Sequence, residues 1–205
     1  MVVDTAGAAG LMGARLYSGA LDAVAQAAML ADIRAVVRAA PLVQPVTPGG
    51  RPMSVRMTSA GRCGWISDRR GYRYAGRHPS GVAWPPIPAS VLEVWQAVSG
   101  WPAAPDCCLV NFYGEGARMG LHQDRDEADL TAPVVSISLG DPGLFRIGGT
   151  ERGGRTRSAW LNSGDVVVLA GSARLAWHGV DRIRFGASPL LAQGGRLNLT
   201  LRVVG

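Results

Sequence analysis

Residues 196–202 read Arg-Leu-Asn-Leu-Thr-Leu-Arg, the clearest strand pattern in the chain. Side chains alternate between the two faces of a strand, so Arg196, Asn198, Thr200 and Arg202 share one face and three leucines share the other. A half-exposed surface strand has the same pattern. The alternative places the polar face inside a barrel and packs the leucines on helices. Buried arginines need anionic partners, so this alternative predicts a dicarboxylate ligand with one carboxylate for each arginine.

Further runs of strand character precede this one, all after Pro105, and turns rich in glycine, asparagine and aspartate separate them. We expect strands at residues 109–113, 119–123, 134–139, 144–147, 158–161, 166–170, 174–177 and 197–204. The 28 glycines and 13 prolines of the chain also favour many short strands over a helical bundle. This succession of short strands predicts a double-stranded β-helix, or jelly roll, over residues 106–205.

The N-terminal half has a different pattern. Residues 1–17 are small and apolar, and we expect them to be loosely ordered. Apolar residues at helical spacing predict a helix from about Ser18, its candidate N-cap, to a stop before Pro41, and a second helix over about 90–98. The predicted fold class is therefore mainly β (α+β). Residues 18–105 supply flanking helices, and the whole chain forms one structural domain.

Composition limits the classes of function. The chain has 205 residues, of which 47% are hydrophobic and 18% charged, so a wholly disordered protein is excluded. The formal net charge is +6 at pH 7, and the excess is almost all arginine. Arginine suits the binding of carboxylates and phosphates, so nucleic acid is a plausible partner.

Cysteine use and hydropathy bear on the compartment. Cys63, Cys107 and Cys108 are odd in number and include no Cys-x-x-Cys pair, so neither a disulfide framework nor a thiolate zinc site is expected. We predict a reducing, cytoplasmic compartment. The N-terminus lacks the pattern of a signal peptide, and no run of about 18 apolar residues predicts a membrane span. Nothing suggests an obligate partner, so we expect a monomer.

A metal site is indicated by His122-Gln123-Asp124. Positions two apart on a strand project to the same face, so one imidazole and one carboxylate converge. A chance surface pair would look the same. His178 is the candidate third ligand, because it follows a strand-like run, whereas His78 lies in a loop and is discounted. Two imidazoles and a carboxylate form the triad that holds Fe(II) and leaves positions open for oxygen and a cosubstrate.

Several blocks in a fixed order carry a family resemblance. They are residues 111–113, 121–127, 133–140, 164–168, 178–179 and 196–202. Over about residues 20–204, this order and spacing resemble the bacterial AlkB family of Fe(II)- and 2-oxoglutarate-dependent nucleic-acid dealkylases. The resemblance implies a DNA repair dioxygenase that consumes O2 and 2-oxoglutarate and releases succinate, CO2 and an aldehyde. It also implies a nucleotide-recognition lid within residues 18–105.

The resemblance assigns roles residue by residue. It implies that iron is bound by His122, Asp124 and His178. For 2-oxoglutarate it implies that Arg196 pairs with the distal carboxylate, helped by Asn111 and Tyr113, and that Asn198 and Arg202 lie near the end that chelates iron. At the substrate it implies that Trp65 and Tyr72 close over the base, Asp126 faces the base edge, Arg152 lies beside it and Tyr74 contacts the DNA backbone.

The chemistry of these substrate residues agrees with that implication. N1-methyladenine and N3-methylcytosine are cationic, so an aromatic clamp and the Asp126 carboxylate would favour them over normal bases. Etheno adducts are a further expected lesion. The base must be flipped or already single-stranded, so we expect single-stranded DNA, with RNA and duplex DNA left open. Ordinary core burial of Trp65 and a solvated or capping role for Asp126 are the plainer alternatives.

Two other functions stay open. A related enzyme of the same fold could oxidise a protein side chain, although the arginines around Trp65 and Tyr72 favour nucleic acid. A catalytically silent nucleic-acid-binding module is the second alternative, and the complete set of candidate iron and 2-oxoglutarate ligands argues against it.

Overall fold

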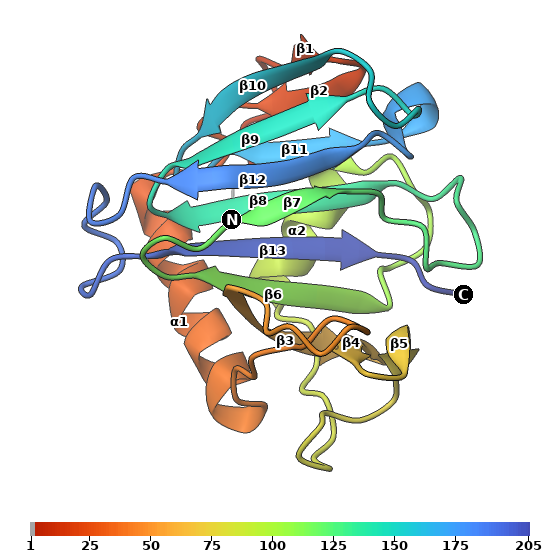
Figure 1. Cartoon of the computed structure of the whole chain (residues 1–205). Helices are drawn as coiled ribbons and strands as arrows, with labels where there is room; N and C mark the ends of the chain where they lie inside the picture. The colour runs from red at the N-terminus through yellow and green to blue at the C-terminus, as the bar shows by residue number, and fades with distance from the viewer. Residues whose placement is uncertain (1–2) are drawn as a thin grey trace.

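The computed structural model describes residues 3–205, and two facing β-sheets form its centre (Figure 1). The larger sheet contains, in spatial order, β1 (Ala9–Leu11), β2 (Ala14–Tyr17), β11 (Val166–Leu169), β8 (Val134–Gly140), β13 (Arg196–Arg202), β6 (Cys107–Tyr113) and β3 (Val55–Gly61). The smaller sheet contains β10 (Thr156–Leu161), β9 (Gly143–Gly148), β12 (His178–Ile183) and β7 (Met119–His122). Neighbouring strands are antiparallel throughout. The predicted jelly roll is confirmed.

In the large sheet β13 lies between β8 and β6, and its two faces differ as the barrel alternative required. The leucines at 197, 199 and 201 are buried in a cluster with residues of α1 (Ala23–Ala39) and α2 (Ala89–Val98). Both helices lie behind the large sheet in Figure 1. The polar residues of β13 face the space between the sheets, where they line a cavity. The plainer interpretation, a half-exposed surface strand, is therefore wrong.

The N-terminal segment is more ordered than expected. The expectation of loose order is wrong for residues 9–17, because β1 and β2 extend the large sheet through pairing of β2 with β11. Ala14 and Tyr17 are buried on this added strand. Residues 1 and 2 of the expected loose segment lie outside the described part of the chain. A strand this short carries little local signal, and β2 is stabilised by its pairing with β11.

The first helix begins later than predicted. Its N-cap is Asp22, whose carboxylate accepts a hydrogen bond from the Ala25 backbone N–H at 2.8 Å. Ser18 is not the cap, because the segment before the helix is tied to the turn ahead of β11. There Gly19 N–H donates to the Asp165 carboxylate and Leu21 N–H donates to the Gly164 carbonyl. The predicted second helix is confirmed, with its start at Ala89.

One predicted strand is wrong. Residues 174–177 are a turn that follows a short 3-10 helix, η1 (Gly171–Ala173), and the strand β12 begins only at His178. The reason is Arg174, whose buried guanidinium donates to the carbonyls of Ala132 and Asp124, each at 2.6 Å. These bonds hold the chain in a turn. The other predicted strands are observed, with ends shifted by a few residues.

A separate hairpin, β4 (Gly64–Asp68) and β5 (Gly71–Ala75), forms a two-stranded sheet beside β3. Gly64 allows it to pack there, because a Cβ atom at that position would lie 2.4 Å from the Trp84 ring. The hairpin occupies the segment in which we expected the lid. Among residues 3–205, no helix has the length and apolar character to cross a bilayer.

Candidate active site

A cavity of about 350 Å³ lies between the two sheets. The polar face of β13 lines it from the large sheet, and the ends of β7 and β12 line it from the small sheet. Trp65 and Tyr72 of the β4–β5 hairpin lie at its edge. The cavity therefore brings together the predicted iron, cosubstrate and base-binding residues, with the exceptions of Tyr74 and Arg152.

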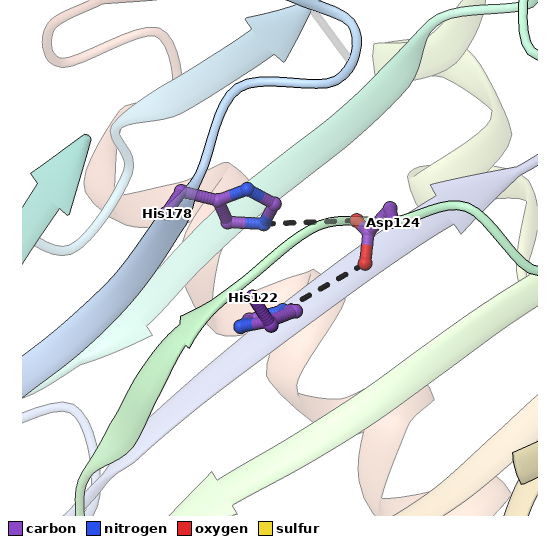
Figure 2. A group of neighbouring side chains, drawn as sticks. All are labelled: His122, Asp124 and His178. Atoms are coloured by element: carbon purple, nitrogen blue, oxygen red, sulfur yellow. Dashed lines mark ion pairs between the residues drawn. The ribbon is translucent and has the colours of Figure 1, made fainter. Parts of the chain in front are cut away.

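Three candidate metal ligands meet in this cavity. The Nε2 atoms of His122 and His178 lie 3.7 Å from Asp124 Oδ1 and Oδ2, respectively. The donor atoms of all three side chains lie within 4.8 Å of one another. His122 ends β7, His178 begins β12, and the two are direct partners in the sheet register. Both imidazoles point toward the Asp124 carboxylate in Figure 2.

The backbone fixes the tautomer of both imidazoles. His122 Nδ1 lies 3.0 Å from the Gly120 carbonyl, and His178 Nδ1 lies 2.9 Å from the Ala176 carbonyl. A carbonyl only accepts, so each Nδ1 carries the proton and each Nε2 presents a lone pair. Asp124 Oδ2 is buried and has no hydrogen-bond partner in the described chain. A divalent cation fits this set of donors.

The charge states at the triad also suit a cation. Burial, reinforced by the neighbouring His122, lowers the pKa of His178 to about 4, so its imidazole is neutral at pH 7. Burial alone would raise the pKa of Asp124. The Arg202 guanidinium and the two imidazoles outweigh that effect and hold the pKa well below its usual range. A carboxylate and a neutral imidazole are the forms that bind metal ions.

Arg196 is a buried cation in need of an anion. It is 0% exposed, and its guanidinium donates to the Leu161 carbonyl at 3.0 Å and to Ser138 Oγ at 2.7 Å. Within residues 3–205 it forms no ion pair, and its Nε has no hydrogen-bond partner. Burial lowers its pKa to about 10, which leaves it charged at pH 7. A carboxylate of a ligand in the cavity would compensate this charge.

Arg202 differs from Arg196. Its Nη2 donates to Asp124 Oδ1 at 2.7 Å, so it already has a carboxylate partner within the protein. A ligand carboxylate at Arg202 would therefore share this guanidinium with Asp124. Arg202 does lie directly beside the candidate metal ligands, as the resemblance implied.

Neutral polar groups complete this part of the cavity. Asn111 and Asn198 are direct partners in the sheet register and both line the cavity. The carboxamide oxygen of Asn111 is buried and has no hydrogen-bond partner among residues 3–205. Burial raises the pKa of Tyr113 to about 12, so its hydroxyl keeps its proton and can donate a hydrogen bond. These groups could orient a carboxylate ligand.

An aromatic pair lies at the cavity edge. Trp65 and Tyr72 are stacked, with ring centroids 5.4 Å apart and an interplanar angle of 17°. Tyr72 is 48% exposed, which is high for a large aromatic residue. Trp65 Nε1 donates to Asp126 Oδ2 at 3.0 Å. Trp65 is half-buried and also packs against a hydrophobic cluster, whereas Asp126 is exposed and bonds to an indole instead of a helix end.

Two predicted substrate residues lie elsewhere. Tyr74 turns inward, where its hydroxyl donates to Glu127 and accepts from Arg202, so the predicted contact with the DNA backbone is not supported. The Arg152 guanidinium lies over the Trp177 ring, 5.7 Å from its centroid, outside the residues that line the cavity. The discounted His78 is indeed structural, with its ring bonded to Ser80 and to the Pro41 carbonyl.

Sequence reasoning missed the buried pair of Glu127 and Arg174. Arg174 Nη2 lies 3.0 Å from Glu127 Oε2, and the two side chains are 3% and 1% exposed, respectively. Glu127 belongs to the run after His122, but no local pattern separates it from an ordinary surface acid. Its partner lies 47 positions away, so only the tertiary fold shows the pairing.

A jelly roll that carries a His-Asp-His triad beside a buried, uncompensated arginine defines an iron- and 2-oxoglutarate-dependent oxygenase. Comparison with known proteins agrees, because the 2OG-Fe(II) oxygenase superfamily matches residues 13–202. An alpha-ketoglutarate-dependent dioxygenase AlkB homolog of Caulobacter vibrioides (strain NA1000 / CB15N) is 54% identical over 188 residues, covering 91% of this chain and 86% of that protein. The chain belongs to the bacterial AlkB family within that superfamily. It is an Fe(II)- and 2-oxoglutarate-dependent dioxygenase that uses O2.

Similarity extends to a solved structure and to shorter matches. The structure of OsALKBH1 superimposes with a TM-score of 0.80 at 30% identity, covering 95% of this chain and 98% of that one. A DNA N(6)-methyladenine demethylase of Arabidopsis thaliana is 40% identical over 109 residues, 48% of this chain and 25% of that protein. A tRNA demethylase of Schizosaccharomyces pombe is 37% identical over 89 residues, 43% of this chain and 29% of that protein.

Proposed function

We propose that this dioxygenase removes N-alkyl groups from bases in single-stranded DNA, with N1-methyladenine, N3-methylcytosine and etheno adducts as substrates. RNA and duplex DNA are further candidate substrates. The observation that carries the proposal is the stacked pair of Trp65 and Tyr72 at the edge of the cavity that holds the His-Asp-His triad. A flat, half-exposed aromatic surface beside an oxidising centre suits an unstacked base.

The iron and cosubstrate ligands are part of this proposal. His122, Asp124 and His178 would hold Fe(II). Arg196 would pair with the distal carboxylate of 2-oxoglutarate, helped by Asn111 and Tyr113. Asn198 and Arg202 would orient the end that chelates iron. Bound there, Fe(II) with 2-oxoglutarate and O2 supplies the oxidation of a C–H bond of the alkyl group, with release of succinate and CO2.

The chain itself contributes position and charge. Trp65 and Tyr72 would hold the base against the mouth of the cavity, and the apolar strands behind it exclude water from the reacting carbon. Asp126 accepts a hydrogen bond from Trp65 and keeps its other oxygen available for a cationic base. Attraction to this carboxylate would favour methylated over normal bases. Arg152 lies over the ring of Trp177, which lines the cavity, and is a candidate contact to the nucleic acid.

The surface around the hairpin supports a polyanionic substrate. Arg69 and Arg70 form the β4–β5 turn and are exposed. Arg73 is less available, because it pairs with Asp68 at 2.7 Å. Exposed guanidiniums beside an aromatic pair are typical of surfaces that follow a phosphate backbone.

A product assay tests the proposal. The intact chain with Fe(II) and O2 is given an oligonucleotide that carries one N1-methyladenine or N3-methylcytosine, with and without 2-oxoglutarate. We expect restored adenine or cytosine together with succinate and an aldehyde, only when 2-oxoglutarate is present. The matched control is Asp124→Ala.

Other outcomes identify the alternatives. If succinate is released only when a peptide is supplied, the substrate is a protein side chain and not a nucleic acid. Oligonucleotide binding without turnover of any substrate would indicate a silent binding module.

We also propose a cytoplasmic monomer. The three cysteines are free thiols, which is typical of a reducing compartment. Mass measurement in solution tests the monomer, and a dimer at micromolar concentration would contradict it.

A further inference from the structure

A buried polar network lies beneath the β4–β5 hairpin and ends on a candidate metal ligand. The Tyr74 hydroxyl donates to Glu127 Oε1, and Glu127 Oε2 accepts from Arg174. Arg202 donates through Nη1 to the Tyr74 hydroxyl at 3.3 Å and through Nη2 to Asp124 at 2.7 Å. The network therefore connects the hairpin to the metal carboxylate through one guanidinium.

Charge and burial make the network sensitive to any change in its members. It contains two carboxylates, Asp124 and Glu127, and two guanidiniums, Arg174 and Arg202, with side chains between 1% and 7% exposed. Arg202 Nε also lies 3.5 Å from Glu127 Oε1. Removing the charge of Glu127 would leave excess positive charge beside Asp124, because these side chains are almost fully buried and the remaining charges are poorly screened.

The network also fixes the orientation of the metal carboxylate. Arg202 binds Asp124 Oδ1, and Arg174 binds the Asp124 backbone carbonyl at 2.6 Å. These contacts hold both the side chain and the backbone of Asp124. They leave Oδ2 without a hydrogen-bond partner in the described chain, 3.7 Å from His178 Nε2.

The hairpin is docked onto this network by two neighbouring residues. Tyr74 is the direct cross-strand partner of Trp65. Tyr74 binds Glu127, and Trp65 binds Asp126, so adjacent residues of the hairpin hold adjacent residues of the segment after Asp124. A movement of the hairpin would therefore reach Arg202 and Asp124 through Tyr74.

We propose that Tyr74 and Glu127 are positioning residues. Through Arg202 they fix the carboxylate of Asp124, so that the affinity for the metal ion depends on the seating of the hairpin. Residues that hold metal ligands in place commonly change metal affinity by about 10- to 100-fold when they are replaced. Only the last test below rests on the proposed function.

The first test measures metal affinity without nucleic acid. Metal-free wild type, Glu127→Gln and Tyr74→Phe are titrated with Mn(II), and binding is followed by paramagnetic resonance. We expect about 10- to 100-fold weaker binding for Glu127→Gln, and a smaller loss in the same direction for Tyr74→Phe. Two matched controls, Glu115→Gln in an exposed turn and Tyr17→Phe on β2, should bind like wild type.

The same variants separate positioning from plain structural support. Thermal unfolding of each metal-free variant shows how much of the chain remains folded at the titration temperature. Lower unfolding temperatures with Mn(II) affinity within twofold of wild type would overturn the proposal, because the network would then stabilise the fold alone.

A second test addresses the link to the hairpin. Coupling between two ligands is reciprocal, so an oligonucleotide with N1-methyladenine should change the Mn(II) affinity of wild type by the same factor as Mn(II) changes oligonucleotide affinity. We expect Tyr74→Phe to reduce that factor toward one. An unchanged factor in Tyr74→Phe would refute the link. A wild type that does not bind the oligonucleotide would contradict the proposed function, while the Mn(II) titration alone would still decide the positioning role.

Discussion

Arg196 and Arg202 lie six positions apart on one strand and have different electrostatic surroundings. Arg202 is paired with Asp124 inside the protein, whereas Arg196 donates to two carbonyls and a hydroxyl and forms no ion pair within the described chain. An uncompensated guanidinium in a cavity is stable only if a ligand supplies the anion. Arg196 is thus the residue on which cosubstrate affinity should depend most.

Replacement of this guanidinium tests that assignment. Arg196→Gln removes a charge-assisted pair, commonly about 1.5–3 kcal/mol, so we expect 2-oxoglutarate affinity to fall about 10- to 100-fold. Isothermal titration calorimetry in the presence of Mn(II) measures the affinity for 2-oxoglutarate. Arg146→Gln is the control, since Arg146 pairs with Asp181 outside the cavity. Equal affinity of wild type and Arg196→Gln would place the cosubstrate elsewhere.

The pH dependence of stability reports on His178. Its pKa is lowered from 6.5 to about 4 by burial, so the unfolded chain binds a proton before the folded chain does as the pH falls. The stability of the metal-free protein is therefore complete above pH 6.5 and falls as the pH drops from 6.5 to about 4, by up to about 3 kcal/mol. Urea unfolding at several pH values measures this loss of unfolding free energy.

The variant His178→Gln isolates this contribution. It should lack the part of the pH dependence that lies between pH 6.5 and about 4. Identical profiles for wild type and His178→Gln would show that the buried imidazole is not the titrating group.

The meeting of His122 with Asp124, and the shared face of the polar β13 residues, could be predicted because the signal is local. His122 ends β7 and Asp124 follows two positions later, and the polar residues of β13 alternate with leucines. Tyr74 could not be placed correctly, because its environment depends on Glu127 and Arg202, which are 53 and 128 positions away. Alternation in a sequence predicts a shared face, but it does not identify the partners of a side chain across the fold.

At the scale of elements, strand alternation predicted the jelly roll, and the errors lie where a long-range contact outweighs the local pattern. Residues 174–177 have strand character, yet the carbonyls that Arg174 binds hold them in a turn. Residues 9–17 have weak propensity, yet pairing with β11 makes them strands. Neither partner is visible in the segment itself.

The β4–β5 hairpin offers a prediction at this scale. Gly64→Ala places a Cβ within 2.4 Å of the Trp84 ring, so we expect a loss of about 1–3 kcal/mol in unfolding free energy. Denaturant unfolding measures the loss, and oligonucleotide affinity should fall as well because the aromatic pair is displaced. Gly76→Ala is the control, since a Cβ there meets nothing within 4 Å. Wild-type stability and affinity in Gly64→Ala would contradict this account of the hairpin.

At the scale of the whole molecule, two sheets enclose the reaction site, and the positive charge around the hairpin faces the solvent. Phosphate contacts release counterions, so the logarithm of affinity for a single-stranded oligonucleotide should fall with the logarithm of salt concentration by about 0.7 per contact. Arg69→Gln and Arg70→Gln should each reduce that slope, and Arg157→Gln on β10 should not. Filter binding at several salt concentrations measures it, and a flat response in wild type would remove the hairpin arginines from the interface.

We propose that His122, Asp124 and His178 hold one ferrous ion beside 2-oxoglutarate. The decisive experiment is an anaerobic titration of the full chain with Fe(II), followed by visible absorption with and without 2-oxoglutarate. We expect a charge-transfer band that saturates at one ion per chain, requires 2-oxoglutarate and disappears in Asp124→Ala. A band that persists in Asp124→Ala, or no band in wild type, would show that the ion is not held by these three residues.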